Sequence, residues 1–190
     1  MATGFEQVEL NYVVPQNFYM VIDLMPTVQY NLQQVTIPSL TGGEAELANR
    51  FNPGRTFIPG NTLDYGTLDV TFLIDKGFIS YREILKWLKG INHPDTHETY
   101  KEWVDKGTDL SKSNNFKNTT STVNLFCTDA AGRPLVEWTF YNAFPTSLAG
   151  PTFDATSVDA EYIQSDVSFR FTHFEHDIYT DSGRKINEKI

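Results

Sequence analysis

Residues 67–75 read Thr-Leu-Asp-Val-Thr-Phe-Leu-Ile-Asp, and this stretch decides the fold class. Every second side chain is apolar: Leu68, Val70, Phe72 and Ile74. The positions between them are mostly polar: Thr67, Asp69, Thr71, Leu73 and Asp75. Alternation with a period of two, in β-branched and aromatic residues, is typical of a strand with one buried face. We therefore expect a sheet whose second face carries hydroxyls and isolated carboxylates.

Strands of the same kind are predicted on both sides of this stretch. Alternating runs cover residues 18–24, 28–33, 122–127, 136–141 and 166–172. The segment Asp129-Ala-Ala-Gly-Arg-Pro134 lies between the third and fourth runs and has the composition of a tight turn. These two runs are therefore predicted to form a hairpin.

A single helix is predicted at residues 80–90. Ser80 and Glu83 match a capping box, and Gly90 is placed to end the helix. The expected apolar stripe consists of Tyr81, Ile84, Leu85 and Leu88. Roughly six strands and one helix predict a mainly β (α+β) fold, an antiparallel β-barrel or sandwich flanked by one α-helix.

The chain of 190 residues has the length of one domain. We expect an N-terminal arm at 1–16, a body at 17–176 and a C-terminal tail at 177–190. Residues 38–62 hold three of the nine prolines and four of the twelve glycines, which predicts a long irregular connection. Connections of that length are commonly functional.

The net charge is −9, and its distribution is uneven. Residues 1–75 carry −6, residues 76–117 carry +2, and residues 118–190 carry −5. This balance disfavours tight binding to nucleic-acid backbones, which needs clustered Lys and Arg. No apolar run reaches the length of a membrane-spanning helix, so no membrane anchor is expected.

The sequence contains no recognisable catalytic, cofactor or metal motif. His93 and His97 are four residues apart, but Pro94 interrupts the helix that a zinc site would need. His173 and His176 would point to opposite faces of a strand. Cys127 lies in a strand pattern and is expected to be a small buried residue. We therefore expect a protein that is not an enzyme and has no cofactor.

Several segments, in this order, resemble the tail tube proteins of contractile-tailed bacteriophages. The segment Arg55-Thr-Phe-Ile-Pro-Gly60 approaches the strand at 67–75, and the helix segment 81–87 follows. Later segments are Val136-Glu-Trp-Thr-Phe-Tyr-Asn-Ala-Phe-Pro-Thr-Ser147 and Phe169-Arg-Phe171. The resemblance covers about residues 17–176.

The resemblance implies a structural virion protein of the phage tail, assembled in the host cytoplasm. Its copies would close into hexameric rings, and the rings would stack into the inner tube through which DNA passes during ejection. Implied partners are further copies of the chain, the sheath, and the baseplate and tail-terminator proteins. Six copies would carry about −54 charges, so DNA would slide through the lumen without specific binding.

Three sets of residues are candidates for the surfaces of such a tube. The expected lumen-facing set is Thr67, Asp69, Thr71, Asp166, Ser168 and Arg170. The connection at 38–62 is expected to bridge rings, through Glu44, Glu46, Arg50, Phe51 and Arg55. The basic middle of the chain is expected to face outward to the sheath, through Lys76, Arg82, Lys86 and Lys89.

Two alternatives remain open at this point. One is another tail component with the same fold: a tube initiator of the baseplate, a tail terminator or the tube of a secretion system. The other is a small ligand-binding β-barrel, which would need a closed apolar cavity within one subunit.

Overall fold

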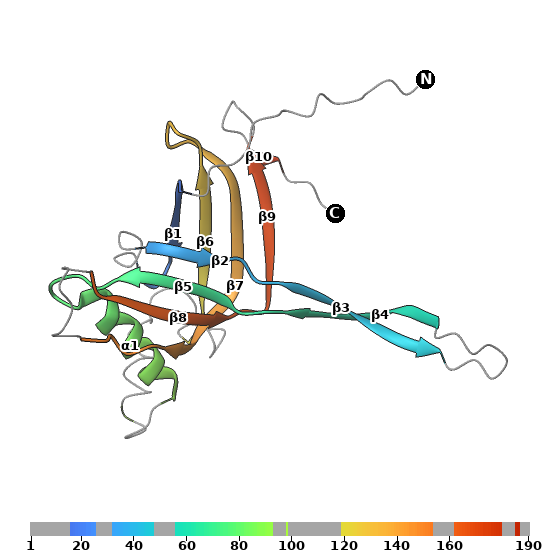
Figure 1. Ribbon diagram of the computed structural model, residues 1–190, viewed down its shortest axis with the longest axis horizontal. Helices are drawn as coiled ribbons and strands as arrows, with labels where there is room; N and C mark the ends of the chain where they lie inside the picture. The colour runs from blue at the N-terminus through green and yellow to red at the C-terminus, as the bar shows by residue number, and fades with distance from the viewer. Residues whose placement is uncertain are drawn as a thin grey trace.

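The computed structural model describes residues 16–25, 32–47, 56–92, 98, 119–153, 162–179 and 185–186. Two antiparallel sheets are joined through one long strand, β7 (Pro134–Leu148). The first half of β7 pairs with β6 (Ser121–Thr128) and β9 (His173–Tyr179), and its second half pairs with β8 (Gln164–Arg170). In Figure 1 the strands around β6 run upward, whereas β8 and its neighbours run across. The predicted fold class is confirmed.

The remaining strands extend the two sheets. β1 (Phe18–Ile22) pairs with β6, and the short β10 (Lys185–Ile186) pairs with β9. We call this first sheet, β1-β6-β7-β9-β10, the upright sheet. β5 (Leu68–Leu73) pairs with β8, and β2 (Leu32–Thr36) pairs with β5. We call the second sheet, β2-β5-β8 with the end of β7, the cross sheet.

The corner between the sheets lies at Asn142. This residue has a φ of 53°, in the left-handed region that asparagine tolerates better than most residues. Its side-chain amide donates to Oγ1 of Thr172 at 3.3 Å, and the Thr172 N–H donates to the Tyr141 carbonyl at 3.0 Å. Thr172 lies in the connection between β8 of one sheet and β9 of the other. The two hydrogen bonds therefore tie this connection to β7 at the corner.

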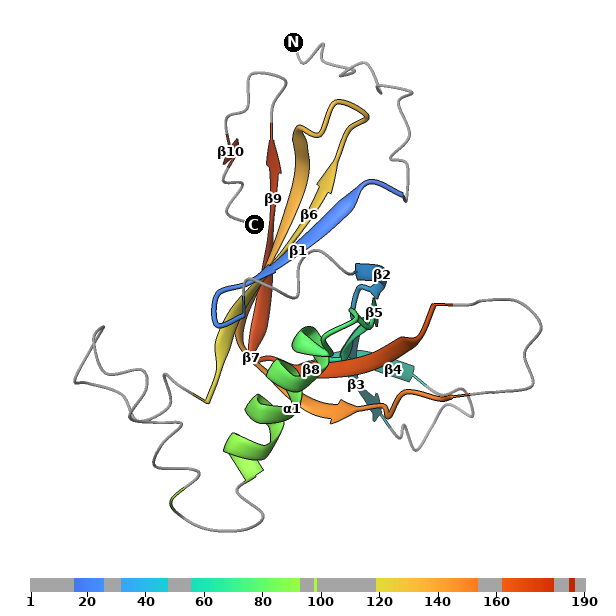
Figure 2. The same cartoon turned by 90° about the vertical axis from the view of Figure 1, so that its left-hand side faces the viewer.

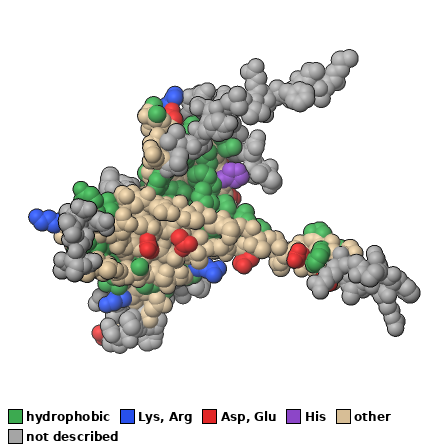
Figure 3. Space-filling model, in the orientation of Figure 1, with side chains coloured by type: hydrophobic (Ala, Val, Ile, Leu, Met, Phe, Trp, Pro, Cys, Tyr) green, Lys and Arg blue, Asp and Glu red, His purple; other side chains and the backbone are tan. Residues whose placement is uncertain are grey.

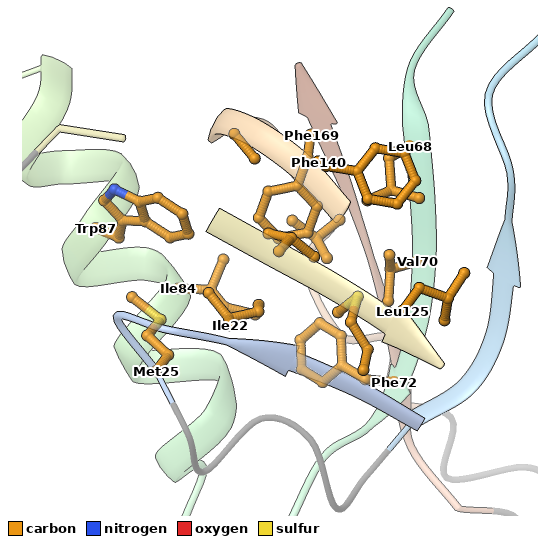
Figure 4. Close-up of a cluster of buried hydrophobic side chains, with 14 residues drawn as sticks. Ile22, Met25, Leu68, Val70, Phe72, Ile84, Trp87, Leu125, Phe140 and Phe169 are labelled. Atoms are coloured by element: carbon orange, nitrogen blue, oxygen red, sulfur yellow. The ribbon is translucent and has the colours of Figure 1, made fainter. Parts of the chain in front are cut away.

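The core fills the space between the two sheets and the helix α1 (Ile79–Asn92) (Figure 4). The upright sheet contributes residues such as Met20, Leu125 and Phe140, and the cross sheet contributes the alternate side chains predicted from the sequence. The buried set of the cross sheet is Leu68, Val70, Phe72, Val167 and Phe169. Because these residues face the core, the polar residues between them face away from it.

Helix α1 begins one residue earlier than predicted and is capped differently. The carboxylate of Asp75 accepts hydrogen bonds from the backbone N–H groups of Gly77, Ile79 and Ser80, each at 3.2 Å. Desolvation raises the pKa of Asp75, but these backbone N–H donors outweigh it and hold the pKa below its ordinary value. The predicted cap at Ser80 is therefore wrong in position, since Ser80 is buried inside the first turn.

The buried stripe of α1 also differs from the predicted one. Its buried residues are Ser80, Ile84, Trp87 and Gly90, so the helix is rotated toward Trp87. Trp87 is fully buried, its ring lies 6.0 Å from that of Phe169, and its Nε1 donates to the Thr119 carbonyl at 3.1 Å. Gly90 does not end the helix, which continues to Asn92.

The region 38–62 is not an irregular connection. Most of its described residues belong to two antiparallel strands, β3 (Leu40–Leu47) and β4 (Thr56–Tyr65), which project from the body in Figure 1 and point away from the viewer in Figure 2. We call these two strands the arm. Gly43 and Gly60 made these strands hard to recognise in the sequence, because glycine is uncommon within strands. In the structure the two glycines lie where the strands come close together. A Cβ on Gly60 would lie 2.9 Å from the carbonyl carbon of Gly43.

Two further predictions concern the chain ends and the run at 28–33. Residues 28–31 lie outside the described part, and the observed strand β2 covers 32–36. The strand β9 was missed, because residues 173–179 mix histidine and carboxylates with the aromatic residues. β9 continues to Tyr179. The bounds of the N-terminal segment 1–16 and of the C-terminal tail 177–190 stay predictions.

Candidate functional surfaces

The cross sheet presents a row of small polar side chains that runs across all four of its strands. Cross-strand register places Ser147 opposite Ser168, Ser168 opposite Asp69, and Asp69 opposite Thr36. The Ser168 hydroxyl donates to the Asp69 carboxylate at 2.6 Å, and the Thr67 hydroxyl donates to the same carboxylate at 3.3 Å. Both Asp69 and Thr36 are exposed.

A second row runs parallel to the first. Asp166 lies opposite Thr71, and Thr71 lies opposite Gln34. The Thr71 hydroxyl donates to the Asp166 carboxylate at 2.6 Å. Each of these two carboxylates therefore accepts a hydrogen bond from a hydroxyl on the neighbouring strand.

The two rows form one surface, which we call the polar face. Arg170 continues it along β8 and donates from a guanidinium nitrogen to the Tyr65 carbonyl at 3.5 Å. Thus all six residues predicted to share a face do so, on the side of the cross sheet opposite the core. Figure 3 shows this side of the molecule over β2, β5 and β8: its side chains are mostly neither charged nor apolar.

A basic surface lies on the other side of the molecule. Lys76 precedes α1, and Arg82, Lys86 and Lys89 follow one another along it; all four are exposed. Since the inner side of α1 packs on the core with Ile84 and Trp87, the exposed Arg82, Lys86 and Lys89 lie on the sides of the helix that face away from the core.

The arm exposes apolar side chains. Leu40, Phe57 and Leu63 are each more than half exposed, and Ile58 is 41% exposed. Two of the predicted inter-ring residues, Glu44 and Glu46, lie exposed on β3. The other three, Arg50, Phe51 and Arg55, lie outside the described residues.

The upright sheet contains a polar network that the sequence did not reveal. Glu137 is only 7% exposed, although it alternates along β7 with the apolar residues Val136 and Trp138. The Tyr179 hydroxyl donates to its carboxylate at 2.7 Å, and the Tyr141 hydroxyl donates to Glu175 at 3.1 Å. These partners lie on β9, so only knowledge of that strand could have predicted them.

The remaining candidates for a reactive or metal-binding site are Cys127 and the histidines, and the structure gives little support to such a role. Cys127 is buried, and burial raises the pKa of its thiol, as for a packed structural cysteine. His173 stacks on Tyr141 with ring centroids 4.6 Å apart, whereas His176 pairs with Trp138 on the other face of β9. His93 and His97 lie outside the described residues. Among the residues that the structure describes, no cluster of three metal-ligating side chains occurs.

Two sheets joined by one long strand, a covering helix and a projecting hairpin are the tail-tube fold. The family described as "T4-like virus tail tube protein gp19" matches residues 16–169. The chain belongs to this family and is a structural tail-tube protein. No curated protein sequence matches it.

Solved structures of contractile injection systems share the fold. A chain of the PVC sheath-tube complex in the extended state superposes with a TM-score of 0.57 at 17% identity, covering 93% of this chain and 99% of that chain. The tube-terminating cap of the anti-feeding prophage gives 0.56 at 18% identity, covering 94% and 99%. The baseplate of the same particle gives 0.55 at 12% identity, covering 87% and 95%. At these identities the likeness establishes the fold alone.

The family is one of structural tube proteins rather than of enzymes. Over the described part of the chain, no helix combines the length and the apolar composition required to cross a membrane.

Proposed function

We propose that copies of this chain close into hexameric rings, that the rings stack into the inner tube of a contractile tail, and that DNA passes through the tube during ejection. Family membership supports the tube itself. The main support for the ring and its lumen is the polar row that runs from Ser147 through Ser168 and Asp69 to Thr36. This row reaches both outer strands of the cross sheet.

The edges of the cross sheet favour closure by copies of itself. No described strand pairs with the outer edge of β2 or with the outer edge of residues 144–148 of β7. The four strands alternate in direction, so β2 of one copy would lie antiparallel to the end of β7 in the next copy. Closure by this pairing would leave no free edge of the cross sheet in a ring, which removes one route to aggregation.

Ring closure in this way would turn the polar face toward the lumen. Thr67, Asp69, Thr71, Asp166, Ser168 and Arg170 are then the lumen-facing residues. Five of these six cannot attract phosphates by charge, so DNA would meet mainly hydroxyls and carboxylates and would release few counterions. A surface of this kind allows DNA to move without being held.

The arm is our candidate for the contact between stacked rings. It extends beyond the body, and the exposed Leu40, Phe57, Ile58 and Leu63 would be desolvated by a neighbouring ring. Glu44 and Glu46 would take part, together with Arg50, Phe51 and Arg55. Deletion of residues 44–52 is expected to leave a folded subunit that forms rings but no long tubes.

The outer surface of α1 is our candidate for the sheath contact. Lys76, Arg82, Lys86 and Lys89 would face an acidic sheath surface, where exposed charges guide association and register. Charge reversal at Lys86 and Lys89 is expected to impair sheath assembly and to leave bare tubes intact. Loss of the tubes themselves would contradict this assignment.

Other partners follow from the same role. Similar chains occur in a sheath-tube complex, in a baseplate and in a terminating cap, which supports sheath, baseplate and terminator partners here. We further propose that the protein is a non-catalytic part of the virion tail, assembled in the host cytoplasm. An initiator or terminator of the same fold is the second candidate.

Negative-stain electron microscopy of the purified protein, over a concentration series with light scattering, tests the proposal. Rings and stacked tubes with a central channel are expected, and indefinite growth would separate a tube from an initiator or terminator. If the protein stays monomeric even after baseplates are added as templates, the tube proposal fails.

A further inference from the structure

The arm leaves the body through two short connections. Residues 37–39 join β2 to β3, and residues 66–67 join β4 to β5. The Gly66 N–H donates to the Ser39 carbonyl at 2.9 Å, which ties the two connections together. Pro38 is buried, but it is followed at once by exposed residues. The arm is thus a continuation of the β2–β5 ribbon (Figure 1), and its direction depends on the contacts at its root.

Tyr65, the last residue of β4, is the only side chain of the arm with described contacts to rings of the body. Its ring centroid lies 5.7 Å from that of Phe171 and 5.8 Å from that of Phe174, with interplanar angles of 68° and 73°. Both are edge-to-face contacts, whose energy depends on ring orientation. Two such contacts restrain the ring from two directions.

The two phenylalanines are themselves anchored. Phe140 is fully buried, and its ring lies 5.0 Å from Phe171 and 5.4 Å from Phe174. Phe171 lies at the corner between β8 and β9, next to Arg170, whose guanidinium contacts the Tyr65 carbonyl. The root of the arm is therefore fixed to the corner where the two sheets meet.

We propose that Tyr65 is a positioning residue: held by Phe171 and Phe174, it sets the direction of the arm and thereby the rotation between successive rings. The second part rests on the proposed role of the arm in ring stacking. The arm amplifies small changes at its root. From Tyr65 to Ile58 the strand spans about 23 Å, so a rotation of about 10° would move the strand there by about 4 Å.

The direction of the arm can be measured in the unassembled full-length subunit. Spin labels at Ala45→Cys on the arm and Lys86→Cys on α1, in a Cys127→Ala background, report one distance by pulsed electron paramagnetic resonance. Both labelled positions are exposed, and Cys127 is buried. Tyr65→Leu removes the ring, and Tyr65→Phe keeps it. The control Tyr19→Leu removes a tyrosine on β1 of the upright sheet, whose ring centroid lies 4.7 Å from that of Phe126.

Tyr65→Leu is expected to broaden the distance distribution or to shift it by about 4 Å, whereas Tyr65→Phe and Tyr19→Leu retain the parent distribution. An unchanged distribution in Tyr65→Leu overturns the proposal. Should Tyr65→Leu fail to fold, Phe171→Leu removes the facing ring instead and carries the same expectation.

Tubes grown from the same variants separate this inference from the proposed function. Cryo-electron microscopy of Tyr65→Leu tubes is expected to show an altered or variable rotation between rings. If the distance changes but the rotation does not, Tyr65 still positions the arm, and the ring-stacking role of the arm is refuted. If the distance does not change, the positioning role is refuted whatever the arm contacts.

Discussion

Reversing one charge on the polar face is expected to convert a sliding surface into one that retains DNA. Asp166→Lys is suited to this test because the carboxylate is exposed and its described hydrogen bond is to the Thr71 hydroxyl. The polar face carries Asp69, Asp166 and Arg170, a net charge of −1 for one subunit and −6 for six. The substitution changes each subunit by two charges, which gives +6 for the same ring.

The size of the effect follows from counterion release. If all six lysines of one ring contact phosphates, the logarithm of the binding constant would fall with the logarithm of salt concentration at a slope of about −5. Binding would then weaken by about a thousandfold between about 50 and 200 mM salt. Arg170 is present in both proteins, so the difference isolates the new lysines.

Co-sedimentation of preassembled tubes with short duplex DNA measures this slope, and nuclease digestion locates the DNA. DNA inside a lumen is expected to be protected, whereas DNA on the outer surface is digested. Asp23→Lys, an exposed substitution of the same charge in the turn after β1, serves as the matched control. Bound DNA that is fully digested in Asp166→Lys tubes, or binding no stronger than in the control, would refute the assignment of the polar face to the lumen.

Three further predictions concern the fold that positions these surfaces. Asp75→Ala is expected to cost about 1 kcal/mol of unfolding free energy at neutral pH. The folded-state pKa of Asp75 lies below its ordinary value of 3.8. The difference in unfolding free energy, measured by urea titration, should therefore vanish as pH falls through the folded pKa. A difference that does not depend on pH would contradict the capping role. Trp87→Ala is expected to cost about 3–5 kcal/mol in the same assay, and a loss below about 1 kcal/mol would mean that α1 does not close the core through this side chain. Gly60→Ala places a methyl group 2.9 Å from Gly43 and should accelerate hydrogen exchange in the arm while leaving the body unchanged; unaltered exchange in the arm would refute the close approach of its strands.

The sequence predicted the elements whose two faces differ most. In β5 and β8 buried residues alternate with exposed or partly exposed ones until the strands end, so the pattern identified both the strands and their polar sides. The shared face of Asp69, Thr71, Asp166 and Ser168 followed from that alternation alone. Their pairing across β5 and β8 did not, because register between strands distant in sequence depends on the complete fold.

The errors arose where tertiary packing chose between local options. Residues 79–92 contain enough apolar side chains for two neighbouring stripes, and contact with Phe169 selected the one centred on Trp87. In the arm, Gly43 and Gly60 were interpreted as strand-breaking residues, although the absence of a Cβ is what lets the two strands meet there. The burial of Glu137 could not be predicted from the sequence, because its partner Tyr179 lies on a strand that the pattern did not indicate.

The distribution of charge changes the physical account of DNA passage. The chain carries −9, but the described polar face accounts for only −1 of it, so most of the negative charge lies elsewhere. In the proposed ring of six copies, the total charge of about −54 would therefore not be the charge of the surface that lines the lumen. What distinguishes the polar face is that the hydroxyls of Thr67, Thr71 and Ser168 donate their hydrogens to the carboxylates of Asp69 and Asp166 and so do not offer them to phosphates. On this account DNA slides because the lining offers few partners to its phosphates, and not because the lining strongly repels them. Asp69→Asn with Asp166→Asn brings the polar face to the same charge of +1 per subunit as Asp166→Lys, but it adds no cation that could contact a phosphate. On this account the double substitution should alter DNA passage far less than Asp166→Lys.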